Sequence, residues 1–103
     1  MPKGYVYFTS NRKHTVLYAG VTSDLKGRIY KHKKNIYKGF ASRYNCDELV
    51  YFEEFTKMAD VIKREKQVKR WRKDWKWKTI QEPNPDLNDL SSDWFDLNRE
   101  LKK

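Results

Sequence analysis

The stretch that decides the fold runs from residue 5 to residue 32 and reads YVYFTSNRKHTVLYAGVTSDLKGRIYKH. It opens with aromatic and β-branched residues, and a second run of that kind fills residues 16–21, so two strands are predicted. The polar residues between them are typical of a turn, which predicts an antiparallel hairpin. Side chains alternate across a sheet, so we expect Tyr7 and Tyr18 on one face and the aliphatic side chains beneath them. Gly20 would allow another group to approach the backbone closely.

A helix is predicted directly after the hairpin. Thr22-Ser23-Asp24 offers N-cap side chains, and residues 25 to about 35 carry apolar residues at helical spacing. Arg28 and His32 are four positions apart on this helix, so they lie on one side of it, one turn from each other. Residues 48–55 then have the composition of a third strand, and a longer helix is expected to follow it.

Glu65 has the most unusual position in the sequence. The longer helix is predicted from about residue 57 to residue 72, or as far as residue 77, and Glu65 falls near the centre of its apolar stripe. The stripe consists of Met58, Val61, Ile62, Val68 and Trp75. A carboxylate that faces a core without a partner is costly, so it either forms a buried ion pair or serves as a metal ligand or acid–base group. The motifs elsewhere in the chain favour the second interpretation.

Two tripeptides in the hairpin carry a family resemblance. Tyr5-Val6-Tyr7 resembles the Gly-Ile-Tyr motif of the GIY-YIG nuclease family. Tyr18-Ala19-Gly20 resembles the Tyr-Ile-Gly motif, at the spacing found in that family. Arg28 and His32 match the family's arginine and the histidine or tyrosine one turn later. Val21 departs from the pattern, because many members have a lysine at that place.

The second half of the chain extends the resemblance. Residues 64–67, together with Trp71, resemble the helix that carries the family's catalytic glutamate, which would be Glu65. Asn84 lies where many members have an asparagine. The chain is similar to the small stand-alone members and to the catalytic domain found in the excision-repair nuclease. The resemblance implies an α+β fold, a small three-stranded antiparallel sheet flanked by helices, in agreement with the predicted order of strands and helices.

The resemblance also implies phosphodiester hydrolysis with one Mg²⁺ or Mn²⁺ ion. Glu65 would hold the ion, with waters in most of its coordination shell. Arg28 would contact the phosphate, Tyr18 would act as the general base or position it, and His32 would help to move protons. Tyr7 would bond to the cluster and orient it. Each of these residues could alone be an ordinary structural side chain, and their joint occurrence in the right order is what favours a catalytic site.

The charge of the chain indicates a polyanionic partner. The 103 residues carry a net charge of +9, but residues 1–81 alone carry +12 and residues 82–103 carry −3. Aromatic residues between the basic runs favour nucleic acid over a basic surface that only keeps the protein soluble. DNA is the expected partner, with contacts from Lys26, Lys31, Lys33, Lys34, Arg43 and Asn84.

The length of the chain suits a single domain. We expect residues 1–81 to form the nuclease core and residues 82–103 to form an acidic extension packed on it. The apolar runs are shorter than the ~20 residues of a membrane span, and the lone Cys46 cannot form a disulfide within the chain, so a cytoplasmic location is expected. The predicted function is a metal-dependent DNA endonuclease in repair or recombination. The alternatives are a nucleic-acid-binding module that keeps the fold without the activity and, more weakly, a protein-interaction domain that uses the acidic extension.

Overall fold

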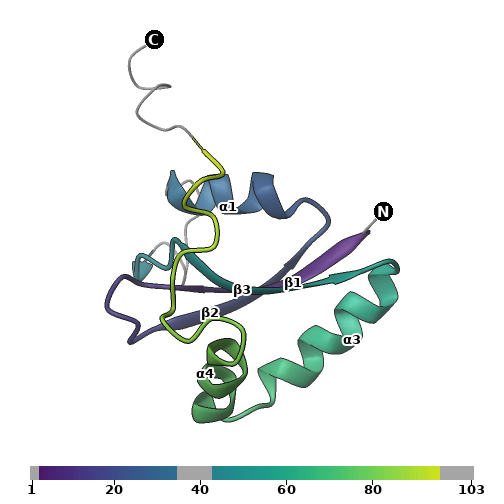
Figure 1. The fold of residues 1–103 in the computed structure, drawn as a ribbon. Coiled ribbons are helices and arrows are strands. Elements are labelled where there is room, and N and C mark those ends of the chain that lie inside the picture. Colours follow the sequence, from purple (N-terminus) through teal and green to yellow (C-terminus); the bar gives the residue numbers. More distant parts are fainter. Residues whose placement is uncertain (1–2, 35–42, 96–103) are drawn as a thin grey trace.

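A three-stranded sheet forms the centre of the protein. The computed structural model describes residues 3–34 and 43–95. Strands β1 (Gly4–Ser10), β2 (Leu17–Thr22) and β3 (Glu48–Phe55) pair in an antiparallel manner in the order β2-β1-β3 (Figure 1). The predicted three-stranded antiparallel sheet flanked by helices is therefore confirmed. β1 is the central strand, and β2 and β3 form the two edges of the sheet.

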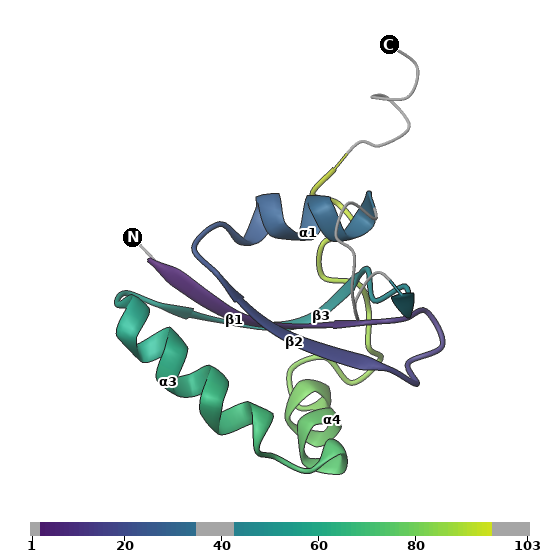
Figure 2. The ribbon, with the colours of Figure 1, turned by 180° about the vertical axis from the view of Figure 1, so that it is seen from behind.

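Helices cover both faces of the sheet. Helix α1 (Leu25–Lys33) lies over one face, while α3 (Met58–Lys69) and α4 (Lys73–Gln81) lie over the opposite face, as Figures 1 and 2 show from two sides. The end predicted for the first helix, near residue 35, falls outside the described residues. None of the helices within the described ranges combines the length and the apolar character that a membrane-spanning helix requires.

The alternation of side chains along β1 divides the core into two layers. The layer between the sheet and helices α3 and α4 contains Val6, Phe8, Val50, Val61, Val68 and Ile80. The layer between the sheet and α1 contains Tyr7, Leu25, Ile29 and Leu49. Tyr7 lies opposite Gly20 in the register of β1 and β2, and Thr9 lies opposite Tyr18. Both tyrosines therefore point to the α1 side, as predicted, because residues two apart on a strand share a face.

The second long helix is predicted to end at about residue 72 or at residue 77, and the longer alternative is wrong. Helix α3 ends at Lys69, and residues 70–72 turn before α4 begins. The backbone N–H groups of Arg70 and Trp71 donate to carbonyl groups three residues earlier, which tightens and ends the helix. The turn gives α4 a new direction. Trp71 and Trp77 both pack against the core layer between the sheet and helices α3 and α4.

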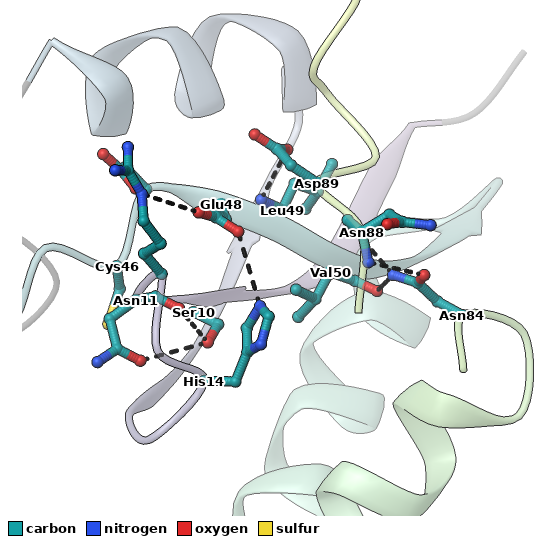
Figure 3. Close-up of polar contacts among 12 residues, drawn as sticks. Ser10, Asn11, His14, Cys46, Glu48, Leu49, Val50, Asn84, Asn88 and Asp89 are labelled. Carbon is teal, nitrogen blue, oxygen red and sulfur yellow. Dashed lines mark hydrogen bonds and ion pairs between the residues drawn. The ribbon is translucent and has the colours of Figure 1, made fainter. Parts of the chain in front are cut away.

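Residues 82–95, called the C-terminal segment below, run along the outer edge of β3. The backbone N–H of Leu90 donates to the carbonyl oxygen of Leu49 at 2.7 Å. The N–H of Leu49 donates to Oδ1 of Asp89 at 3.1 Å, as Figure 3 shows. The side-chain amide of Asn84 donates to the carbonyl oxygen of Val50 at 3.0 Å. These bonds occupy backbone groups at the start of an edge strand, so the segment packs directly on the sheet.

Candidate active site

Three aromatic rings meet on the α1 side of the sheet. The hydroxyl oxygen of Tyr7 lies 3.1 Å from Nε2 of His32, and this contact is buried. The ring centroid of Tyr18 lies 6.4 Å from that of Tyr7 and 5.7 Å from that of His32. Tyr7 is fully buried, whereas Tyr18 is only half-buried. The structure thus brings together three of the residues predicted for the site, and Tyr18 is the one of the two tyrosines that solvent reaches.

Helix α1 is anchored so that its polar side meets these tyrosines. Asp24 caps the helix, because its Oδ1 accepts a hydrogen bond from the N–H of Gly27 at 3.1 Å. Leu25 and Ile29, four residues apart, are buried against the sheet and fix the rotation of the helix. Arg28 and His32 occupy the neighbouring stripe, with Arg28 half-buried. The predicted pairing of these two residues on one side of the helix agrees with this arrangement.

His32 is held in its neutral form. Burial of the imidazole, assisted by the positive charge of Arg28, lowers its pKa from the ordinary 6.5 to about 4. A neutral imidazole has one N–H donor and one acceptor nitrogen. At pH 7 the ring can therefore share a single proton with the hydroxyl of Tyr7, and it carries no charge of its own.

Gly20 makes room for Tyr7. A Cβ atom on Gly20 would lie 2.5 Å from the hydroxyl oxygen of Tyr7 and 2.6 Å from its Cζ, which is closer than real Cβ contacts. The close approach expected at this glycine is thus made by the tyrosine directly across the sheet. Gly20, the last residue of the second motif, is therefore required for the packing of Tyr7, the last residue of the first motif.

Glu65 lies on the other side of the sheet, on α3. Its side chain is 21% exposed, and Oε2 lies 3.6 Å from Nζ of Lys69. The predicted apolar stripe is wrong in part, because Met58, Ile62 and Trp75 are 37%, 45% and 60% exposed. Only Val61 and Val68 hold α3 against the sheet by full burial. Glu65 lies four residues after Val61 and three before Val68, so it shares their side of the helix while 21% of its side chain stays exposed.

The two halves of the predicted site lie on opposite faces of the sheet. α1 and α3 lie on opposite faces, and the start of the β3 edge is occupied by the C-terminal segment. β2 forms the other edge, and α3 packs against it. Because α3 packs against β2, a ligand that lies across the edge of β2 could contact both Tyr18 and Glu65.

The donor set suits a hydrated metal ion and not a protein cage. Within residues 3–34 and 43–95, no group of three or more His, Cys, Asp or Glu side chains could hold a metal ion together. Mg²⁺ keeps several waters and is commonly bound through one or two carboxylates together with substrate phosphates. Glu65 fits that mode as a single, solvent-accessible carboxylate, although Lys69 would compete with the ion for it.

Four of the predicted DNA contacts lie at or near the surface. Lys26, Lys31 and Arg43 are exposed, and Lys34 is half-buried. Nζ of Lys34 lies 5.6 Å from the ring centroid of Tyr30, and the guanidinium of Arg43 lies 5.9 Å from the ring of Tyr44. These pairs place cations beside aromatic rings, an arrangement that suits contact with phosphates and bases.

Lys33 and Asn84 are placed differently from the expectation. Nζ of Lys33 donates to Oδ2 of Asp89 and to the carbonyl oxygen of Asp47, and the side chain is only 14% exposed. Asn84 is 5% exposed, and its amide donates to the carbonyl oxygens of Val50 and Asn88. Both side chains hold the C-terminal segment in place, so neither is presented to a ligand.

Arg64, the neighbour of Glu65, is also engaged within the protein. Its Nε and Nη2 donate to the two carboxylate oxygens of Glu53 at 2.8 and 3.0 Å, and its guanidinium lies 4.9 Å from the ring centroid of Trp71. Tyr51 donates to the same carboxylate. This network on β3 and α3 was not predicted, because residues 53 and 64 have no local spacing in the sequence that would pair them.

Comparison with known proteins agrees with these motifs. The family model of the GIY-YIG catalytic domain matches residues 3–79. A UPF0213 protein of Staphylococcus epidermidis is 32% identical over 82 residues, which span 80% of this chain and 99% of that protein. UPF0213 proteins of Staphylococcus saprophyticus and Staphylococcus haemolyticus are 30% and 29% identical with the same coverage. No solved structure gives a significant match.

Proposed function

Because the chain belongs to the GIY-YIG family, a nuclease-type superfamily, we propose that it is a metal-dependent endonuclease that hydrolyses phosphodiester bonds in DNA. The observation that carries the proposal is the cluster of Tyr7, Tyr18 and His32, joined by the Tyr7–His32 contact at 3.1 Å. A buried polar contact between strand and helix supports a preorganised site, because it fixes side chains before substrate arrives. We propose further that the protein acts in the cytoplasm and takes part in DNA repair or recombination.

The side chains of the α1 face would handle the phosphate and the protons. Arg28 would contact the phosphate, since a guanidinium binds phosphate oxygens in forked geometry. Tyr18, the solvent-accessible tyrosine, would hold the attacking water through its hydroxyl. His32 would relay a proton and not store one, because an imidazole with a pKa of about 4 releases a proton readily at neutral pH. Tyr7 would hold His32 in position.

Glu65 would bind the single Mg²⁺ or Mn²⁺ ion from the opposite side of the β2 edge. When bound, such an ion supplies charge neutralisation at the phosphate and lowers the pKa of a bound water. The half-exposed Lys69 beside Glu65 would shift to solvent when the carboxylate takes a metal ion, because its side chain is 53% exposed. The surface position of the pair makes this exchange inexpensive.

The net charge of +12 in residues 1–81 supports DNA as the substrate. Lys26, Lys31, Lys34 and Arg43 would contact the backbone phosphates, together with cations of α3. Lys63 and Lys66 of α3, together with Arg70 directly after it, line a surface pocket of about 460 Å³ beside Trp71. Contacts of this kind give affinity without sequence readout.

Cleavage assays test the proposal. Purified protein is incubated with single-stranded, duplex and nicked DNA in Mg²⁺, in Mn²⁺ and in EDTA. We expect metal-dependent cleavage that Glu65→Ala, Arg28→Ala and Tyr18→Phe each remove, while Glu82→Ala, at an exposed position outside the cluster, retains it. Equal activity of wild type and Glu65→Ala would contradict the role given to Glu65. Binding without cleavage on every substrate would favour the non-catalytic binding module.

A further inference from the structure

A pocket of about 300 Å³ opens on the α1 side of the sheet. Its lining consists of Tyr5, Leu25, Lys26, Phe52, Glu54 and Trp94. The first strand, the third strand, the start of α1 and the C-terminal segment all contribute to it. Its volume lies at the lower end of the roughly 300–1,000 Å³ typical of small-molecule pockets, so it suits one planar ring system and not a large ligand.

Three half-buried aromatic rings form the wall of this pocket. Tyr5 lies opposite Glu54, and Tyr7 lies opposite Phe52, in the register of β1 and β3, so these side chains share the α1 face. The ring centroids of Tyr5 and Phe52 are 6.4 Å apart, and those of Phe52 and Trp94 are 6.3 Å apart, both in edge-to-face geometry. Because each ring is only partly covered, the wall offers aromatic surface to a ligand.

The rim of the pocket carries one charge of each sign. Lys26 on the first turn of α1 and Glu54 on β3 are both exposed. A cation beside an aromatic wall suits a phosphate, and a carboxylate suits a ligand that presents N–H donors. A purely apolar ligand would use neither group. An unpaired nucleotide would use both, together with the rings.

The pocket lies next to the candidate active site. Tyr5 and Tyr7 are two residues apart on β1 and face the same side, which separates them by about 7 Å along the strand. Adjacent nucleotides of an extended strand are separated by a similar distance. A strand whose phosphate lies at the tyrosine cluster could therefore place a neighbouring base at the pocket.

We propose that this pocket binds the base of an unpaired nucleotide in the DNA strand, stacked on the rings of Tyr5, Phe52 and Trp94. Glu54 accepts a hydrogen bond from the exocyclic amino group of the base, and Lys26 contacts the adjoining phosphate. Single-stranded nucleic acids are commonly bound in this way, by aromatic stacking beside cations. The proposal rests on the proposed function for DNA as the ligand, and it adds a preference for unpaired bases that carry an amino group.

Trp94, which forms part of the pocket wall, lies outside the residues that the family model matches. The family model ends at residue 79, so the C-terminal segment that supplies Trp94 lies beyond it. The segment holds Trp94 through Asp89, which binds Lys33 and the N–H groups of Leu49 and Ser91. The aromatic wall could also serve only to anchor the segment, and binding measurements separate these two roles.

The first measurement compares affinities for single-stranded and duplex DNA of the same length in EDTA, by fluorescence anisotropy. We expect Trp94→Ala to weaken single-strand binding by roughly 5- to 150-fold, the range found when a base-stacking side chain is removed. Duplex binding should not change, because its bases are already stacked. The matched control is Trp75→Ala, which removes a 60% exposed tryptophan on the other side of the sheet and should leave the ratio of the two affinities unchanged. An unchanged ratio in a folded Trp94→Ala protein would overturn the proposal.

The second measurement does not depend on the stability of the C-terminal segment. Glu54→Gln changes an exposed side chain, and the ligands are short oligodeoxynucleotides that contain either cytosine or uracil at the unpaired positions. Cytosine presents an amino donor where uracil presents a carbonyl acceptor. We expect wild type to prefer cytosine and Glu54→Gln to lose that preference. Equal affinity of wild type for the two ligands would overturn the role of Glu54 and the proposed pocket with it.

Both measurements are made without a divalent metal, so they do not depend on cleavage. A protein that fails to cleave DNA but shows the cytosine preference would retain the base pocket and lose the proposed catalytic function. A protein that cleaves DNA and shows neither effect would retain the catalytic function and lose the base pocket.

Discussion

The hydroxyl of Tyr7 and Nε2 of His32, 25 positions apart in the sequence, lie 3.1 Å from each other in a buried contact. Tyr7 belongs to the central strand, and His32 belongs to the helix that covers it. The contact ties the polar side of α1 to the sheet at the place where Tyr18 also packs. The protonation state of one imidazole is therefore coupled to the position of the helix that carries Arg28.

We expect His32 to make the folded state less stable in mild acid. Burial holds the pKa of His32 at about 4 in the folded protein, against 6.5 for a free histidine. Above pH 6.5 both states are neutral and stability is complete, whereas between pH 6.5 and pH 4 only the unfolded state takes up the proton. One pKa unit corresponds to about 1.4 kcal/mol, so the loss near pH 4 approaches about 3 kcal/mol.

Urea unfolding at pH 7, 5.5 and 4 measures this loss. The variant His32→Gln removes the titrating group, so the stability difference between wild type and variant should shrink as the pH falls. The control is His14→Asn, which removes the other histidine at a position with φ of 56°, a backbone conformation that asparagine tolerates well. A difference between wild type and His32→Gln that stays constant with pH would contradict the prediction.

Gly20→Ala should destabilise the protein by about 1–3 kcal/mol, the usual cost of overpacking. The added Cβ would lie 2.5 Å from the hydroxyl oxygen of Tyr7, which is fully buried and bonded to His32. Chemical denaturation gives the value. In a Tyr7→Leu background the ring atoms are gone, so the same substitution should cost less. The same cost in both backgrounds would show that the contact with Tyr7 is not the cause.

Glu65→Gln should remove cleavage and leave stability within about 1 kcal/mol of wild type, because the pair with the exposed Lys69 is of the surface type. Glu53→Gln is the matched control, since the two glutamate side chains are 19% and 21% exposed. Glu53 accepts bonds from Arg64 and Tyr51, so its replacement should cost about 1.5–3 kcal/mol and spare cleavage. Thermal melts and cleavage assays on Glu65→Gln and Glu53→Gln test both expectations. A large loss of stability in Glu65→Gln would argue that Glu65 is structural.

Lys31→Ala and Lys33→Ala should separate DNA contact from structure. Lys31 is exposed, so its removal should reduce the slope of log K against log salt by about 0.9 for duplex DNA. Lys33 is 14% exposed and bound to Asp89, so its removal should leave that slope unchanged and lower stability instead. Burial alone would raise the pKa of Asp89, but the bonds from Lys33 and Ser91 outweigh it and hold that pKa below its usual value. Salt titrations of DNA binding and thermal melts check both expectations. A lower slope of log K against log salt for Lys33→Ala would contradict the structural role of Lys33.

The features of the site that follow a fixed geometric period could be predicted from the sequence. The alternation of a strand places Tyr7 and Tyr18 on one face, and the period of a helix places Arg28 and His32 on one side. The lowered pKa of His32 could not be predicted, because it depends on burial by residues from other elements. The exposure of Met58 and Ile62 could not be predicted for the same reason, since a helical wheel does not show how closely a helix approaches its sheet.

The parts of the fold that depend on distant residues could not be predicted. The turn at residues 70–72 contains no glycine or proline that would mark it in the sequence, and it is accompanied by the packing of Trp71 and Trp77 against the core. The pairing of Lys33 with Asp89 joins residues 56 positions apart. Because Lys33 lies in a basic run, the sequence predicts that it contacts DNA. In the structure it binds the C-terminal segment instead.

The bonds between the C-terminal segment and β3 also bear on self-association. An unpaired strand edge can recruit the same edge of a second copy, and long aromatic strands are the most prone to such growth. Leu90, Asp89 and Asn84 occupy backbone groups of Leu49 and Val50 at the start of this strand, which continues into two aromatic residues. The start of the β3 edge is thereby protected against aggregation, and the proposed substrate would lie across the other edge of the sheet, that of β2.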